Sequence, residues 1–314
     1  MSEKEQTESP FELVTACLAA SALLYSFSSA VVVLRFQIRA ARSPSRLRRL
    51  LGLNSLWPVR LLVVLFASLI CFSELLHLRV LRRCLPRPVS SSLCTAHSLL
   101  SPSFAEPAFF STLLFLLRGS THPKPPHSSV AATASTFLSA SAYALSVSLP
   151  FLLLHAAFLS LPDSLFLRLG LPADFLGHAH RRRCSVPLFA TVLLALLAAV
   201  YVPLFVSACW SVVAVVINKR LRTRLYTLTA SVVASLSVQV AALAFASLWP
   251  PSSAVSQGLS LVAFVSVLVS IVAGEAILVL QPVVDSLAVF VDPVTGHRRS
   301  GDDGSRPAQD IGGV

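Results

Sequence analysis

The residues best suited to chemistry in this chain are acids that lie inside long apolar stretches. Glu106 stands directly before Pro107, and Glu275 follows Gly274, each within a run of mostly hydrophobic residues. A charge inside a bilayer costs about 3 kcal/mol or more, so such residues usually face a bundle interior and take part in function. Gln239 adds an amide to the middle of another apolar run. We predict that these side chains line an ion or proton pathway or a polar ligand pocket; the alternative is a structural role between helices.

Four further ionisable residues are expected near one end of the apolar runs: Glu74, His77, His97 and His155. Imidazole titrates near neutral pH and binds metals together with carboxylates. A cluster of these groups would therefore sense pH or bind an ion. The simpler interpretation is that they are separate residues at helix ends, and we predict no metal site.

Arginine recurs every three or four residues at Arg39, Arg42, Arg46 and Arg49, which would place one helix face in contact with anionic lipid or a cytosolic partner. The alternative is that this charge only sets the topology. Other basic residues lie in short turns between apolar runs rather than on one soluble face, so nucleic acid is not an expected partner. No Ser/His/Asp set, Walker loop or dinucleotide fingerprint is present, so we predict neither an enzyme nor a cofactor.

The apolar runs that carry these residues are long enough to cross a membrane. Hydrophobic residues make up 55% of the 314 and charged residues 12%, with a mean hydropathy of +0.76. A soluble domain carries about 25% charged residues. A span needs about 20 mostly apolar residues, and seven runs qualify: 13–34, 56–76, 94–117, 131–159, 186–217, 226–248 and 259–280. The sequence therefore predicts an all-α membrane protein, a seven-transmembrane helix bundle.

The basic residues that flank the first run set its predicted orientation. Lys4 precedes that run among glutamates, whereas six arginines follow it between Arg35 and Arg49. Because Lys and Arg accumulate on the cytosolic side, the N-terminus is predicted to lie outside and, after seven spans, the C-terminus in the cytosol. The arginines at 79–87 and 181–183 would then lie outside, which is the main observation against this orientation.

We divide the chain into a short polar N-terminal segment (1–12), a transmembrane domain (13–291) and a cytosolic tail (292–314). The Gly, Asp, Ser and Arg content of the tail is typical of disorder. The expected location is the plasma membrane or an endomembrane of the secretory pathway. Small residues recur at steps of four in the fourth run, from Ala132 to Ser148, and predict close helix packing inside the bundle or at a homodimer seam.

Seven spans with these ends resemble the architecture of G-protein-coupled receptors. The receptor motifs are missing, since the seventh run ends in Gln281-Pro282-Val283-Val284-Asp285 rather than Asn-Pro-x-x-Tyr. A closer likeness lies in segments 54–60, 73–76 and 104–109, which read NSLWPVR, SELL and FAEPAF. These are similar to uncharacterised plant seven-transmembrane proteins classed as candidate G-protein-coupled receptors. That resemblance implies seven spans, marks Glu74 and Glu106 as motif members, and implies no particular activity.

The receptor architecture also suggests a disulfide. Cys94 opens the third run and Cys184 lies between the fourth and fifth, at the two places that many seven-helix receptors join. Both would face the oxidising side, where disulfides persist. We predict a Cys94–Cys184 bridge, whose loop of about 90 residues would contribute roughly 4 kcal/mol in the chain-entropy model. A Cys84–Cys94 bridge and free thiols are the alternatives.

The sequence favours a receptor-like signalling or scaffolding role. The alternative is a small-solute or proton-coupled transporter that uses Glu106 and Glu275. A water-filled path that reached Glu106 from both sides would favour transport, whereas a closed core with an outside cup would favour a receptor.

Overall fold

The computed structural model describes residues 10–42, 56–78, 93, 96–119, 130–160, 188–250 and 253–285. Within these ranges the regular structure is helical, with no strand, which confirms the all-α class. The long α-helices are α1 (Pro10–Arg42), α3 (Trp57–His77), α6 (Glu106–Gly119), α7 (Val130–Ser160), α9 (Leu188–Val215), α10 (Lys219–Ala246) and α11 (Ala254–Gly274). Two π-helical segments adjoin these helices: η2 (Ser101–Ala105) directly precedes α6, and η5 (Glu275–Leu280) directly follows α11.

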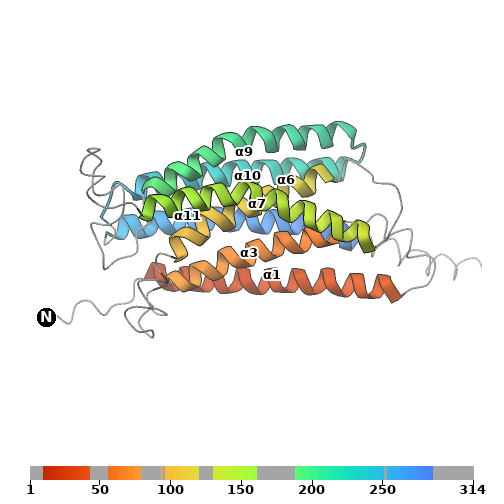
Figure 1. Ribbon diagram of the computed structural model, residues 1–314, viewed down its shortest axis with the longest axis horizontal. Helices are drawn as coiled ribbons and strands as arrows, with labels where there is room; N and C mark the ends of the chain where they lie inside the picture. The colour runs from red at the N-terminus through yellow and green to blue at the C-terminus, as the bar shows by residue number, and fades with distance from the viewer. Residues whose placement is uncertain are drawn as a thin grey trace, which may run out of the picture.

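Seven helices of the described residues are long and apolar enough to cross a membrane, as the sequence predicts. The third continues through η2 and α6 as Ala96–Gly119, and the seventh continues through α11 and η5 as Ala254–Asp285. The helices run roughly along the long axis of the molecule, with α1 along one edge and α9 along the opposite edge (Figure 1). Together these features identify an integral membrane protein.

Several helix ends differ from the predicted ones because local capping extends the helices. α1 begins at Pro10, so the predicted boundary between segments 1–12 and 13–291 falls inside a helix; proline suits a first helical turn, where no N–H bond is needed. α10 begins seven residues before the predicted Tyr226, where the Asn218 side chain accepts a hydrogen bond from the Arg220 N–H. The Ser253 hydroxyl caps α11 in the same way.

The third span forms the centre of the bundle. α6 contacts α3, α7, α9 and η5, and its fully buried side chains include Phe109, Phe110, Leu113 and Leu114. Large apolar side chains on the outer faces remain exposed, among them Leu24, Phe27, Trp210 and Val215. Apolar residues that face outward are expected where hydrocarbon replaces water.

Small residues let neighbouring helices approach this centre. Thr136, Ala140, Ala144 and Ser148 on α7 are all buried, as predicted from their spacing, and α7 packs against α6. On α11, an added Cβ at Gly274 would lie 3.1 Å from Cδ2 of Leu113. The seventh and third spans are therefore in close contact directly beside Glu275.

Candidate functional site

Glu106 lies at the buried centre of the bundle, where other spans supply its polar contacts. Its side chain is 5% exposed. Nε2 of Gln239 on α10 lies 2.6 Å from Oε2 of Glu106, and the Ser101 hydroxyl lies 3.5 Å from Oε1. Gln239 is itself 3% exposed, so both residues lie in the bundle interior; their contact with each other was not predicted from the sequence.

The helix widens directly before Glu106. The N–H of Glu106 bonds the carbonyl of Ser101, five residues earlier, which closes the π segment η2. Pro107 has no N–H, so it leaves a carbonyl of the same turn short of a donor. Such π segments occur frequently at functional sites. Glu275 stands at the first residue of the other π segment, so both buried acids lie at a junction between α- and π-helix.

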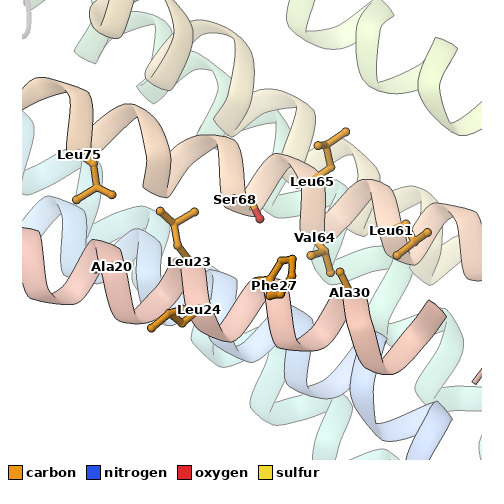
Figure 2. A pocket seen from close by; sticks show the side chains of 10 residues that line it. All are labelled: Ala20, Leu23, Leu24, Phe27, Ala30, Leu61, Val64, Leu65, Ser68 and Leu75. Carbon is orange, nitrogen blue, oxygen red and sulfur yellow. The ribbon is translucent and has the colours of Figure 1, made fainter. Parts of the chain in front are cut away.

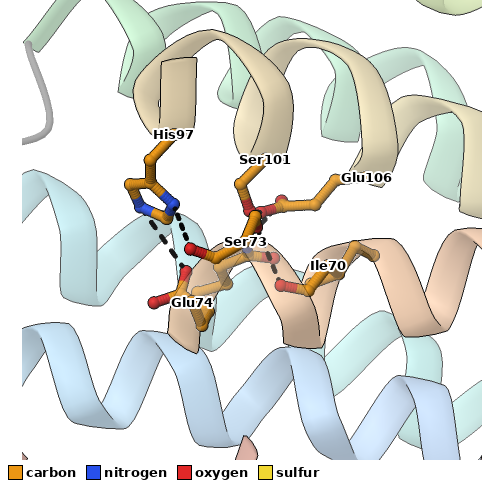
Figure 3. A network of polar contacts seen from close by, with 7 residues as sticks. Ile70, Ser73, Glu74, His97, Ser101 and Glu106 are labelled. Carbon is orange, nitrogen blue, oxygen red and sulfur yellow. Dashed lines mark hydrogen bonds and ion pairs between the residues drawn. The ribbon is translucent and has the colours of Figure 1, made fainter. Parts of the chain in front are cut away.

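Glu74 and His97 form a second polar contact nearer the end of the bundle (Figure 3). The His97 Nδ1–H donates to the Ser73 carbonyl at 3.0 Å, which fixes that nitrogen as a donor. Its Nε2 faces Oε1 of Glu74 at 3.8 Å, a distance compatible with an ion pair but too long for a direct hydrogen bond. His97 is buried and Glu74 is half-buried, so this pair lies at the margin of the core.

Glu275 makes a third buried contact, between the seventh and first spans. The Ser26 hydroxyl donates to its Oε1 at 2.6 Å, and its Oε2 has no partner within the described residues. Both side chains are 0% exposed. Ser26 was not singled out from the sequence, because serines are common in all of these spans and usually bond their own helix.

The elements that carry the acids pack against one another. Glu74 lies on α3, and α3 contacts both α6, which begins at Glu106, and η5, which begins at Glu275. The π segment η5 packs against α1, α3, α6 and α10. Among the described residues, neither Glu106 nor Glu275 forms an ion pair with Lys or Arg. Acids far apart in the sequence therefore share one region of the bundle without a paired cation.

The predicted set of Glu74, His77, His97 and His155 is not a single cluster in the part of the chain that the structure describes. His155 on α7 is 0% exposed and bonds the Ser103 hydroxyl through Nδ1, while Glu74 pairs with His97. His155 also contacts the Phe189 ring, and its Nε2 is buried without a partner. No group of His, Cys, Asp or Glu in the searched residues is able to hold a metal ion.

A separate groove of about 680 Å³ lies between α1 and α3 (Figure 2). Its walls are apolar, with Leu23, Phe27 and Val64 among them, and Ser68 is the one hydroxyl-bearing residue of the lining. Leu24 and Leu65, which also line it, are more than half exposed. In a membrane this surface faces hydrocarbon, and it does not include the acids of the core.

Several predicted residues fall outside the described structure. His77 ends α3, but its side chain is not among those described, and the same holds for Arg42 at the end of α1. Arg46, Arg49, Cys94, Cys184 and the tail 292–314 lie wholly outside the described residues. Arg39 is exposed on the last turns of α1. The arginine face and the disulfide therefore stay predictions.

The search of curated proteins and the search of solved structures each returned no match. A family model, by contrast, matches residues 1–293, which is most of the 314-residue chain. That match spans every helix described above and each of the buried acids. The chain therefore belongs to the family described as Uncharacterised conserved protein UCP031277.

Proposed function

We propose that this protein is a proton-coupled transporter of a small solute, with Glu106 as its central proton carrier. The observation that supports this best is that Glu106 and Glu275 are both buried on elements that pack against one another, α6 and η5, with no Lys or Arg paired to either acid among the described residues. Acid and histidine chains inside membrane spans are typical of proton relays in pumps and transporters.

The physical reason is the cost of a lone charge away from water. An ionised carboxylate without a cation partner is expensive inside a membrane, whereas the protonated form is neutral and keeps its hydrogen bonds. Loss of the proton must therefore accompany a change that brings water, a solute or another charge to the site. In this way the charge state of Glu106 and the conformation of the bundle are coupled.

The polar contacts suggest how protons would reach Glu106. The Glu74–His97 pair lies toward the end of the bundle, and Ser101, four residues after His97 on the third span, contacts Glu106. Glu106 is ten residues from the start of that span at Ala96, which corresponds to a depth of about 15 Å along a helix. A proton would thus enter at Glu74 and His97 and pass inward to Glu106.

The receptor-like signalling or scaffolding role that the sequence favours is the second candidate. The enclosure of Glu106, at 5% exposed, supports it, because a closed core is compatible with a ligand that binds elsewhere and shifts the bundle between two conformations. With either function we propose an outside N-terminus, a cytosolic C-terminus, and residence in the plasma membrane or a secretory-pathway endomembrane. The exposed Arg39 end of α1 would then contact anionic lipid or a cytosolic partner; a homodimer is a further proposal.

Purified protein in liposomes tests the transport function. Small solutes such as amino acids, sugars and organic acids are added outside in turn, and a trapped pH-sensitive dye reports proton entry. We expect at least one solute to drive proton influx, and Glu106→Gln to abolish that influx. Asp285→Asn is the matched control, because Asp285 is an exposed acid paired with Arg224 at the end of the seventh span. A screen without any solute-driven influx, or an unaffected Glu106→Gln, would reject the proposal.

A further inference from the structure

We propose that Gln239 is a positioning residue that keeps Glu106 hydrogen-bonded in both of its charge states, by turning its side-chain amide over when the proton arrives or leaves. The inference rests on the proposed function, in which Glu106 gains and loses a proton. It assigns Gln239 a role in that step rather than in packing alone.

The distance between the two side chains suits both states. At 2.6 Å, the contact between Gln239 and Oε2 of Glu106 is slightly shorter than the usual N–H···O range and falls inside the O–H···O range. An ionised Glu106 accepts a hydrogen bond from the amide N–H₂, while a protonated Glu106 donates its O–H to the amide oxygen. The nitrogen and oxygen of a glutamine amide have nearly the same shape, so either orientation fits the same space.

The rest of the amide does not oppose this rotation. Oε1 of Gln239 is buried and has no hydrogen-bond partner within the described residues. Within the described residues, the contact with Glu106 is therefore the only hydrogen bond of the side-chain amide, and no second bond must break for it to turn. The terminal torsion of glutamine is broad and roughly two-fold, which makes a half-turn inexpensive.

Among the residues that the structure describes, no other group near Glu106 is placed to keep it hydrogen-bonded in both charge states. Ser101 lies 3.5 Å from Oε1, a weak contact at the limit of a hydrogen bond. Of the ionisable groups, Glu74 on α3 is within electrostatic range, while His97 faces Glu74, Glu275 bonds Ser26 on α1, and His155 bonds Ser103. Without Gln239, one charge state of Glu106 would be left almost unbonded in the core.

In this step one O–H bond breaks and one forms. Protonated Glu74, beside His97, gives up its proton, and the proton adds to Oε2 of ionised Glu106, so the negative charge moves from Glu106 to Glu74. The N–H···O hydrogen bond from Gln239 is lost, the amide turns over, and the new O–H donates to the amide oxygen. Departure of the proton reverses each change, so Glu106 always has one strong hydrogen bond to the same side chain.

Infrared difference spectroscopy of the full chain in lipid nanodiscs tests the inference. The carbonyl stretching band of protonated Glu106 is identified as the band that Glu106→Gln removes. In Gln239→Met, which has nearly the same length but no hydrogen-bonding group, we expect this band to move to higher wavenumber and solute-driven proton influx to fall at least tenfold. Ser235→Ala, a buried serine one turn away on α10, should change neither. An unmoved band in Gln239→Met would overturn the inference.

A second measurement needs no variant of Gln239 and remains decisive if Gln239→Met does not fold. Glutamine labelled with ¹³C at its side-chain carbonyl is incorporated, and spectra at acid and alkaline pH are subtracted. We expect a glutamine amide band in the difference spectrum that Glu106→Gln eliminates; its absence from the unaltered protein would count against the inference. If the carbonyl band moves in Gln239→Met but no solute drives proton influx, the transport function alone is rejected. If solute-driven influx requires Glu106 but is unchanged in Gln239→Met, this inference alone is rejected.

Discussion

The hydrogen bond between Glu106 and Gln239 predicts a specific pattern of stability in a double-mutant cycle. Glu106→Met removes the one hydrogen-bond partner that the Gln239 amide has among the described residues, and Gln239→Met leaves Glu106 with a 3.5 Å contact to Ser101. A buried polar group that loses its partner costs about 1–3 kcal/mol. We therefore expect each single change to lower the free energy of unfolding by roughly that amount.

The double variant Glu106→Met/Gln239→Met should lose less than the sum of the two single changes, because no polar group of the pair is then left unpaired and both side chains are apolar. Couplings of this kind measured inside membranes average about 0.6 kcal/mol and reach about 1.7 kcal/mol. The contact here is short and both groups are at most 5% exposed, so we expect a coupling of roughly 1 kcal/mol, near the upper part of that range.

The assay is unfolding of the purified protein by SDS titration in bicelles, with all four members of the cycle. A control cycle pairs Gln239→Met with Asp285→Asn. Asp285 bonds Arg224, which lies fifteen residues from Gln239 along α10, a separation of about 22 Å. Distant changes of this kind should add within about 0.5 kcal/mol. Additivity in the Glu106–Gln239 cycle as well would refute a direct bond between these side chains.

Gly274→Ala should change the free energy of unfolding little, because the new methyl lies 3.1 Å from Cδ2 of Leu113 and the gain of about 1 kcal/mol in helix propensity offsets a small displacement. Gly274→Leu should cost about 1–3 kcal/mol or more in the same SDS titration, and equal stability of the two variants would contradict the close packing. Mass spectrometry of unreduced peptides should find Cys94 joined to Cys184; recovery of both as alkylated thiols would remove the bridge. An N-terminal epitope should be reached from outside and a C-terminal reporter from the cytosol, and a cytosolic N-terminus together with a cytosolic C-terminus would contradict the predicted orientation.

Membrane class and the positions of the spans follow from the sequence because hydrocarbon imposes a local requirement. Each span must be apolar over about 20 residues and must satisfy its own backbone hydrogen bonds, so length and hydropathy alone locate it. The helix ends were less accurate, since Asn218 and Ser253 cap helices several residues before the apolar runs begin. The cost of placing a carboxylate or an unpaired amide in lipid likewise marked Glu106, Glu275 and Gln239 as interior residues, and all three are buried.

Which polar groups meet was decided only by the tertiary structure. Sequence spacing relates residues on one helix, whereas Gln239 reaches Glu106 from another span and Ser26 reaches Glu275 across 249 positions of the chain. The π segment that places Ser101 beside Glu106 adds a residue to one turn, so the usual three- or four-residue spacing does not reveal the contact. The different partners of His155 and His97, Ser103 and Glu74, have the same origin, because helix rotation in the bundle determines which side chains meet.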